Sequence, residues 1–350
     1  MRVTSLPRYG CPIIAQAARR LVPLLHSPAT AQGGPMNSST LAIIGGAGFV
    51  GSRLCARLAR DGHTVRVLTR HRERHRDLLV LPTVEVWEGN PHDAAVLDAL
   101  LAGCDVVINL VGILNEKRHD GSGFEHAHVE LPRRIIEACR RRGIKRLLHM
   151  SALGADAAQG VSHYQRSKGR GEDLVLAASD LDVTVFRPSV IFGPGDNFLR
   201  RFAGLLRLAP VFPLACAGAR FQPVFVGDVA ECFARAIDNP QTIGQRYDLC
   251  GPRDYTLLEL VRYTARISGM RRWILPLPDW LSRLQAEIFE WLPGKPFSRD
   301  NYLSTKHDNV CKKPFPAIFG ITPTPLETVA PYYLGQAGER RRYERLRRRD

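Results

Sequence analysis

One stretch decides the fold of this chain: Thr40-Leu41-Ala42-Ile43-Ile44-Gly45-Gly46-Ala47-Gly48-Phe49-Val50-Gly51. Its first five residues favour a buried strand, and glycines spaced three apart follow at once. Gly45 allows a tight turn, Gly48 lets the backbone approach a pyrophosphate, and Gly51 lets the next helix pack close to the strand. The stretch therefore predicts a dinucleotide pocket at a helix N-terminus. The alternative is an ordinary strand-turn-helix corner, because glycine-rich turns occur in many folds.

The residues around this stretch alternate between strand and helix patterns. Further strands are expected over residues 63–68, 84–87, 105–112 and 146–151, with helices over 52–60 and 132–142 between them. This rhythm predicts an α/β fold, a Rossmann-type doubly wound parallel sheet with right-handed crossovers. We expect the NAD(P)-binding Rossmann domain over residues 39–190 and a smaller C-terminal α/β substrate lobe over 191–335. Residues 1–38 are expected to be a disordered extension or a mis-assigned start, and residues 336–350 a basic tail.

The end of the second expected strand bears on which cofactor is preferred. NAD-binding proteins usually carry an acidic residue there to hold the ribose 2′-hydroxyl, but this chain continues with Arg70. A guanidinium suits a 2′-phosphate, so NADP(H) is the predicted cofactor and NAD(H) the alternative. Arg70 could instead belong to a merely solvated basic loop. The other expected cofactor-binding residues lie in the glycine stretch and at strand exits: Gly46, Ala47, Phe49, Val50, Asn90, Leu110, Val111, Gly112, Arg187 and Pro188.

Tyr164 and Lys168 form the candidate reactive pair. They lie four residues apart in a predicted helix after the fifth strand, so they share one helix face. The ammonium is expected to lower the pKa of the phenol and to hold the nicotinamide ribose. Tyr164 would then exchange a proton with a carbonyl or carbinol while a hydride moves.

With these motifs, the chain resembles the extended branch of the short-chain dehydrogenase/reductase superfamily, the NAD-dependent epimerases and dehydratases. The resemblance covers residues 39–335 and is closest to the group of the nucleotide-binding accessory subunit of respiratory complex I and its bacterial relatives. The stretch Pro223-Val-Phe-Val-Gly-Asp-Val-Ala230 also supports the superfamily resemblance. The closer likeness rests on these stretches: Arg187-Pro-Ser-Val-Ile-Phe-Gly-Pro-Gly-Asp-Asn-Phe198, Tyr247-Asp-Leu-Cys-Gly-Pro252, Leu292-Pro-Gly-Lys-Pro-Phe-Ser-Arg-Asp300 and Asp308-Asn309-Val310.

Two positions depart from the pattern of active relatives. Ala152 occupies the position of the usual Ser or Thr, with Ser151 one residue early, and His128 stands where the family often has Asn. Ser151 or Ser162 could substitute, and Tyr164, Lys168 and Ser151 are the catalytic candidates. The resemblance then implies a weakly or non-catalytic nucleotide-binding subunit linked to respiratory or quinone metabolism. The alternative is an active NADP-dependent reductase or epimerase acting on a nucleotide sugar, isoprenoid or quinone-like carbonyl.

The eight cysteines are scattered along the chain. No CxxC pair and no Cys/His cluster at zinc spacing occurs, so we expect reduced thiols, a reducing compartment and no metal site.

Charge and hydropathy indicate which partners to expect. Much of the formal net charge of +15 lies in the two ends, and no aromatic-interleaved basic stripe occurs, so no specific nucleic acid is expected as partner. No apolar run is long enough to span a bilayer. Trp280, Leu284, Ile288 and Trp291 recur at helical spacing. They predict either a packed cap or a face that docks on a membrane or on a respiratory or quinone-handling assembly. The expected location is cytoplasmic, with peripheral attachment to the inner face of the inner membrane as the docked form.

Overall fold

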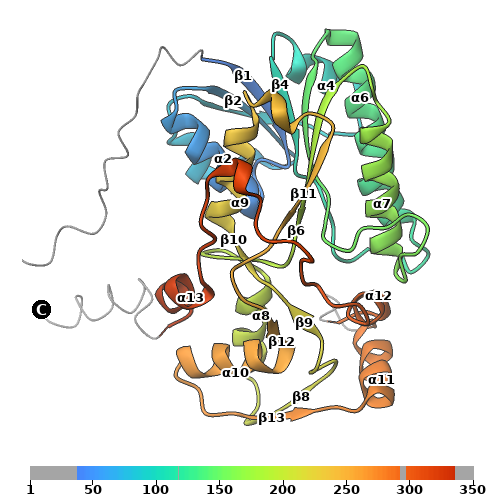
Figure 1. Cartoon of the computed structure of the whole chain (residues 1–350), viewed down its shortest axis with the longest axis vertical. Coiled ribbons are helices and arrows are strands. Elements are labelled where there is room, and N and C mark those ends of the chain that lie inside the picture. Colours follow the sequence, from blue (N-terminus) through green and yellow to red (C-terminus); the bar gives the residue numbers. More distant parts are fainter. Residues whose placement is uncertain (1–37, 117, 292–296, 336–350) are drawn as a thin grey trace, which may run out of the picture. The chain divides into compact units, whose positions relative to one another are not determined.

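The structure is a computed structural model that describes residues 38–116, 118–291 and 297–335. Its centre is a seven-stranded sheet in the order β11-β6-β5-β4-β1-β2-β3, in which all neighbours are parallel (Figure 1). The strands are β1 (Thr40–Ile44), β2 (Thr64–Thr69), β3 (Val84–Glu88), β4 (Val106–Asn109), β5 (Arg146–Met150), β6 (Asp182–Pro188) and β11 (Gln245–Leu249). The predicted Rossmann-type parallel sheet is confirmed.

Helices cover both faces of this sheet. On one face lie α2 (Phe49–Arg60) and α9 (Val226–Ala236); on the other lie α4 (Ala94–Leu101), α6 (Leu131–Arg142) and α7 (His163–Leu176) (Figure 1). Successive residues of β1 serve different faces, since side chains alternate along a strand. Ile43 packs in the core with α2 and α9, whereas Ile44 packs in the core with α4, α6 and α7. This two-sided burial explains why the strand is apolar throughout.

The strand order reverses between β1 and β4. From β1 the chain proceeds outward through β2 and β3, and from β4 it proceeds the other way through β5 and β6. Loops at the carboxyl ends of β1 and β4 therefore leave in opposite directions and open a crevice, which is where open α/β sheets bind their ligands. The glycine stretch follows β1, so the topology places it at this crevice.

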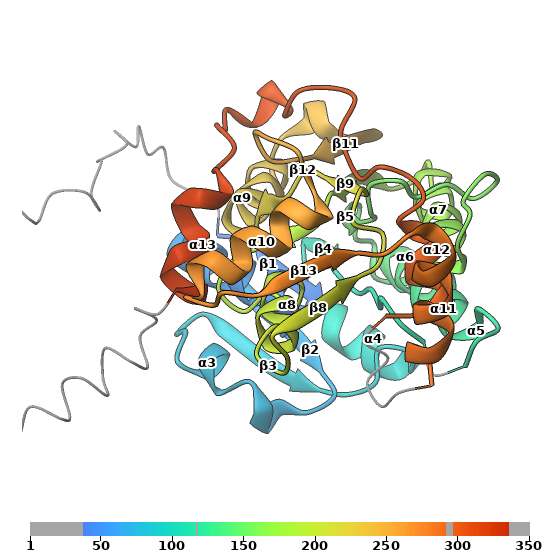
Figure 2. The ribbon, with the colours of Figure 1, turned by 90° about the horizontal axis from the view of Figure 1, so that it is seen from below.

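The remaining elements lie mainly beyond the carboxyl edge of the sheet. In Figure 2 the parallel pair of β8 and β13 lies in front, next to α11. The strands are β7 (Ile191–Phe192), β8 (Val211–Leu214), β9 (Arg220–Phe221), β10 (Val224–Phe225), β12 (Tyr255–Thr256) and β13 (Trp273–Pro276). The helices are α3 (Arg76–Leu79), α5 (Ser122–Glu125), α8 (Phe198–Leu205), α10 (Leu257–Ile267), α11 (Asp279–Phe289), α12 (Arg299–Ser304) and α13 (Leu326–Leu334).

The chain returns to the central sheet after residue 190. Both α9 and β11 come from the expected substrate lobe, 191–335, yet they complete the Rossmann layers, because β11 pairs with β6 along its whole length. The proposed N-terminal extension, apart from Ser38, and the basic tail lie outside the described residues. Among the described helices, none is long and apolar enough to cross a bilayer.

The expectation of reduced thiols throughout needs a correction. Cys250 and Cys311 form a disulfide, with their Cα atoms 6.1 Å apart. The two cysteines are separated by 61 positions in the sequence. Their spacing gave no signal because only the return of the chain across the sheet brings them together. Cys55, Cys104, Cys139, Cys216 and Cys232 carry free thiols.

Candidate functional site

The glycine stretch forms a tight backbone cradle that other residues would disrupt. Gly45 has φ +85°, a conformation that favours glycine. A Cβ on Gly51 would lie 2.4 Å from the Cα of Gly46, so α2 packs against the turn as closely as its backbone permits. A Cβ on Gly45 would lie 3.1 Å from the carbonyl carbon of Leu110, so the loop after β4 closes the cradle from the other side.

The N-terminus of α2 points its free amides into this cradle. Gly48 caps the helix without a side-chain hydrogen bond, and the first turn contains no acidic residue. The first N–H groups of a helix have no partner within it, and the helix dipole favours a negative charge there. A pyrophosphate would satisfy these donors, so the residues present fit a dinucleotide cofactor.

Arg70 and Asn90 lie at the carboxyl ends of neighbouring strands. Arg70 follows β2 directly and its side chain is exposed. Asn90 follows β3, and its Oδ1 accepts the backbone N–H of His92 at 3.1 Å. Because β2 and β3 pair from Val65↔Val84 to Thr69↔Glu88, both residues fall at the edge where an adenosine ribose would lie.

Lys168 occupies the crevice between β4 and β5. The side chain is 3% exposed, and its Nζ donates to the carbonyl oxygens of Met150 at 3.1 Å and Val111 at 3.4 Å. Burial lowers the pKa of this ammonium to about 8, partly offset by Glu172. A Cβ on Gly112 would lie 3.0 Å from Nζ, so the predicted glycine at the exit of β4 leaves room for the lysine.

Tyr164 stands one turn before Lys168 on α7, as the spacing predicts. Its half-buried ring lies edge-on to the rings of Phe124 and His128. The expected lowering of its pKa needs a correction: burial, together with the charge of Asp300, raises the pKa of the phenol to about 12. The ammonium of Lys168 donates to the carbonyl oxygens of Met150 and Val111 and not to the phenol of Tyr164.

His128 holds the exit of β4 against α7. Its Nε2 accepts the backbone N–H of Ile113 at 3.1 Å, and its Nδ1 lies 2.9 Å from the Oγ of Ser167, which in turn donates to the carbonyl oxygen of Tyr164. This pattern fits a neutral ring with the proton on Nδ1. Burial, with the nearby charge of Lys168, lowers the pKa of His128 to about 2.

Ser151 and Ser162 differ in whether their hydroxyl groups are engaged. The Ser151 side chain is 3% exposed, and its Oγ has no hydrogen-bond partner among the described residues. Ser162 caps α7, accepting the N–H of Gln165 at 3.1 Å, and lies 2.8 Å from the Oγ of Ser304. Ser151 therefore has an available hydroxyl, whereas Ser162 is committed to the helix cap. Ala152 is buried and supplies no hydroxyl.

Arg187 is directed into an ion pair. Its Nε lies 3.0 Å from the carboxylate of Glu172, which is 1% exposed, and it also donates to the carbonyl oxygen of Ala155. Pro188 ends β6, and its carbonyl oxygen accepts the N–H of Leu153 at 2.9 Å. These two expected cofactor residues thus organise the loops beside the crevice.

The sequence reasoning gave no role to Asp300 or Asn309, although both lie in stretches that carry the family likeness. Asp300 accepts the N–H groups of His163 at 2.6 Å and Tyr164 at 3.2 Å. It also lines a cavity of about 220 Å³ next to the start of α7, with Phe124 and Leu303. No local pattern marks such a residue, because its partners lie more than a hundred positions away.

Known proteins share this architecture. Residues 41–250 match the NAD dependent epimerase/dehydratase family. The chain is 32% identical over 297 residues to "NADH dehydrogenase [ubiquinone] 1 alpha subcomplex subunit 9, mitochondrial" of Rattus norvegicus, covering 81% of this chain and 77% of that protein. It is also 32% identical over 247 residues to "Ceramide reductase" of Caulobacter vibrioides, covering 68% of this chain and 74% of that protein.

Solved structures agree on the fold. The crystal structure of gox2253 superimposes with a TM-score of 0.67 at 22% identity, covering 84% of this chain and 96% of that chain. The structure of MoeE5 in complex with UDP-glucose and NAD has a TM-score of 0.58 at 20% identity, over 69% of this chain and 85% of that chain. With the family match over most of the sheet and its crevice, the chain belongs to the NAD dependent epimerase/dehydratase family, the extended short-chain dehydrogenases/reductases.

Proposed function

We propose that this protein binds a nicotinamide dinucleotide and retains it as a weakly or non-catalytic subunit of a respiratory or quinone-handling assembly. The contrast between two parts of the crevice carries the proposal. The phosphate cradle formed by the glycine stretch and α2 is complete. The set of side chains that would transfer a proton to a substrate is incomplete, because position 152 has no hydroxyl and the pKa of Tyr164 is raised to about 12.

NADP(H) is the preferred cofactor in this proposal. Arg70 is exposed directly after β2, where its planar guanidinium can pair with a 2′-phosphate through charge-assisted hydrogen bonds. NAD(H) lacks that phosphate and would form no charge-assisted pair with Arg70.

Each residue at the nicotinamide end has a binding role in this scheme. The bound cofactor would supply or accept a hydride. Lys168 would hold the nicotinamide ribose with its buried ammonium, and the neutral His128 keeps the loop at Ile113 against α7. At neutral pH Tyr164 stays a phenol, so it can donate a hydrogen bond, but the phenolate that would act as a base is scarce.

Similarity to two kinds of relatives supports two different functions. The similarity to proteins named as subunits of a ubiquinone-dependent NADH dehydrogenase supports the assembly role. The similarity to a protein named "Ceramide reductase" supports the second candidate, an active reductase or epimerase acting on a nucleotide sugar, isoprenoid or quinone-like carbonyl. The unpartnered hydroxyl of Ser151 favours that candidate, since it could donate to a substrate oxygen.

The face of α11, together with Trp291 two residues beyond its end, supports docking on a membrane complex. Trp280 and Trp291 are 68% and 83% exposed, and Leu284 and Ile288 lie exposed between them. A contiguous stripe of exposed apolar side chains is unusual on a surface that contacts only solvent. In this proposal the protein is made in the cytoplasm and docks through this stripe at the inner face of the inner membrane.

Turnover and fractionation test the proposed function together. We expect purified protein to bind NADPH but to leave it unoxidised with a panel of carbonyl compounds. In the native host, part of the protein should resist a high-salt wash of membranes and co-migrate with a large assembly on a native gel. NADPH oxidation that disappears in Tyr164→Phe, with the protein entirely in the soluble fraction, would establish the reductase instead.

A further inference from the structure

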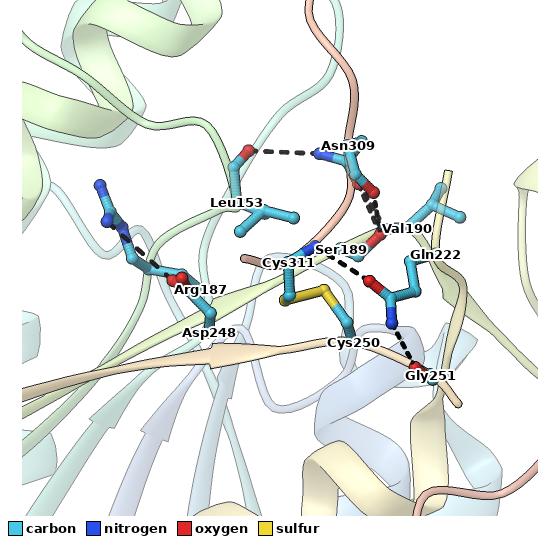
Figure 3. The surroundings of a disulfide bond; sticks show 10 residues. All are labelled: Leu153, Arg187, Ser189, Val190, Gln222, Asp248, Cys250, Gly251, Asn309 and Cys311. Atoms are coloured by element: carbon cyan, nitrogen blue, oxygen red, sulfur yellow. Dashed lines mark hydrogen bonds and ion pairs between the residues drawn. A yellow bond between two sulfur atoms is a disulfide. The ribbon is translucent and has the colours of Figure 1, made fainter. Parts of the chain in front are cut away.

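The Cys250–Cys311 disulfide joins two segments at the carboxyl edge of the sheet. Cys250 directly follows β11, and Cys311 lies in the segment that leads away from α12 (Figure 3). Gln222 braces the same junction: its Oε1 accepts the N–H of Cys311 at 2.9 Å, and its Nε2 donates to the carbonyl oxygen of Gly251 at 2.7 Å. The disulfide is therefore the covalent part of a larger junction.

Asn309, two residues before Cys311, extends this junction to the crevice. Its Nδ2 donates to the carbonyl oxygen of Leu153 at 3.3 Å. Its Oδ1 accepts from the Ser189 hydroxyl at 2.6 Å and from the N–H of Val190 at 3.1 Å. One amide side chain thus ties together the loops that follow β5 and β6 (Figure 3).

These two loops carry candidate site residues. Leu153 comes two positions after Ser151, and Ser189 comes directly after Pro188. The N–H of Leu153 donates to the carbonyl oxygen of Pro188, so the loops also contact each other. Asn309 is therefore connected by hydrogen bonds to loops on the nicotinamide side of the proposed cofactor site.

The two cysteine residues differ in exposure. Cys250 is 3% exposed, whereas Cys311 is half-buried and is followed by the exposed Lys312 and Lys313. Neighbouring positive charge favours a thiolate and attracts an anionic attacking thiolate. Cys311 is therefore the more exposed partner of the disulfide.

We propose that Cys250–Cys311 is a thiol–disulfide exchange site for dithiol reductants, and that its reduction loosens the loops after β5 and β6. A thiolate of the dithiol attacks the Sγ of Cys311, the bond between the two cysteine sulfurs breaks, and the Cys250 thiolate leaves and takes up a proton. The second thiol of the dithiol, as a thiolate, then attacks the first dithiol sulfur in the mixed disulfide. This releases the Cys311 thiolate, which takes up a proton. The dithiol loses two electrons and becomes a cyclic disulfide, while the protein gains two thiols.

Reduction acts on the crevice by removing a covalent restraint. The hydrogen bonds of Asn309 remain possible, but the segment that presents them is then held to its neighbours by non-covalent contacts alone. These include the bond of Cys311 to Gln222 and the bond from the N–H of Asn309 to the carbonyl oxygen of Arg220. Local opening of this segment becomes more frequent, which exposes the amides that it protects. The expected loss of cofactor affinity rests on the proposed function, whereas the change in amide protection does not.

Amide hydrogen exchange of the full-length protein tests the proposal. The N–H of Val190 and the N–H of Gln222 both donate to Asn309, so they report directly on its position. We expect reduction with dithiothreitol to speed exchange at these two amides about tenfold. The N–H of Leu110, bonded to β1 across the sheet, serves as the unaffected reference.

Three variants separate the disulfide from general effects of reduction. Cys250→Ser combined with Cys311→Ser should exchange like reduced protein and stop responding to dithiothreitol. Cys216→Ser removes another partly accessible cysteine and should behave like the unaltered protein. Asn309→Ala keeps the disulfide but removes the tie, so it should speed exchange at Val190 without reduction.

The outcomes are distinct. Peptide mapping that finds Cys250 and Cys311 unlinked after oxidation would overturn the proposal, and so would unchanged exchange at Val190 after verified reduction. NADPH titration of both forms supplies the second readout, with weaker binding expected after reduction. Equal NADPH affinity in the oxidised and reduced forms would overturn the link to the crevice. Absence of NADPH binding in both forms would contradict the proposed function; the hydrogen-exchange result would then decide the redox site by itself.

Discussion

The carboxylate of Asp300 caps the helix that carries Tyr164. Its Oδ2 accepts the N–H of Tyr164 at 3.2 Å, and its Oδ1 accepts the preceding N–H at 2.6 Å. The same negative charge helps to raise the pKa of the Tyr164 phenol, after burial, to about 12. One residue from α12 therefore both positions the tyrosine and disfavours its ionisation.

Replacing Asp300 by Asn should lower the pKa of Tyr164. The amide oxygen can still accept one N–H, but the negative charge is gone, so the phenolate becomes less unfavourable and burial alone keeps the pKa raised. Ultraviolet titration of tyrosinate, with a Tyr164→Phe background subtracted, measures the shift. Glu116→Gln is the matched control, since Glu116 also accepts backbone N–H groups near this cavity. A pKa that stays in place in Asp300→Asn would contradict the electrostatic role.

Replacing Arg70 by Asp should weaken NADPH binding by about 10- to 100-fold, because charge-assisted hydrogen bonds contribute on the order of 1.5–3 kcal/mol. NADH binding should hold or strengthen, because the new carboxylate can accept a hydrogen bond from the ribose 2′-hydroxyl. Calorimetric titration with both cofactors measures the difference. Arg74→Asp alters an exposed arginine in the short 3-10 helix that follows β2 and serves as the control. Tighter binding of NADH than of NADPH by the unaltered protein would refute the preference.

Replacing Ala152 by Ser should increase turnover of a carbonyl substrate. The new hydroxyl would lie beside the crevice, and one such donor in a preorganised site is worth about 100-fold in rate. NADPH oxidation with the carbonyl panel measures the gain. Ala155→Ser places a hydroxyl at another buried alanine three positions on and should have no effect. If both variants behave like the unaltered protein, the missing hydroxyl is not what limits turnover.

Acid should destabilise the fold through two buried imidazoles. Burial, with the charge of Lys168, lowers the pKa of His128 to about 2 and that of His149 to about 3. Below a pH of about 6.5 the unfolded chain binds protons on these rings that the folded chain does not bind, so the free energy of unfolding falls as the pH falls.

Urea unfolding followed between pH 7 and pH 4 measures this dependence. In His128→Asn the free energy of unfolding should fall less steeply as the pH falls. Replacement of the exposed His71 by Asn should leave that pH dependence unchanged. If the free energy of unfolding of His128→Asn falls as steeply with pH as that of the unaltered protein, other groups govern acid unfolding.

Local patterns fixed the positions of the glycine cradle and of the candidate reactive pair, Tyr164 and Lys168. The glycine spacing is set by contacts within a single turn, such as the approach of Gly51 to Gly46. Tyr164 and Lys168 share a helix face because four residues make about one helical turn. Both features depend on neighbours in the sequence, so the sequence alone was enough to place them on the fold.

Only the tertiary structure decided what several of these side chains do. Ser162 is occupied as a helix cap, Arg187 is paired with buried Glu172, and Asp300 acts on Tyr164 from 136 positions away. The Cys250–Cys311 disulfide likewise depends on the return of the chain through β11. Hydrogen bonds, burial and charge act through space, and a linear pattern does not contain the distances between segments that set them.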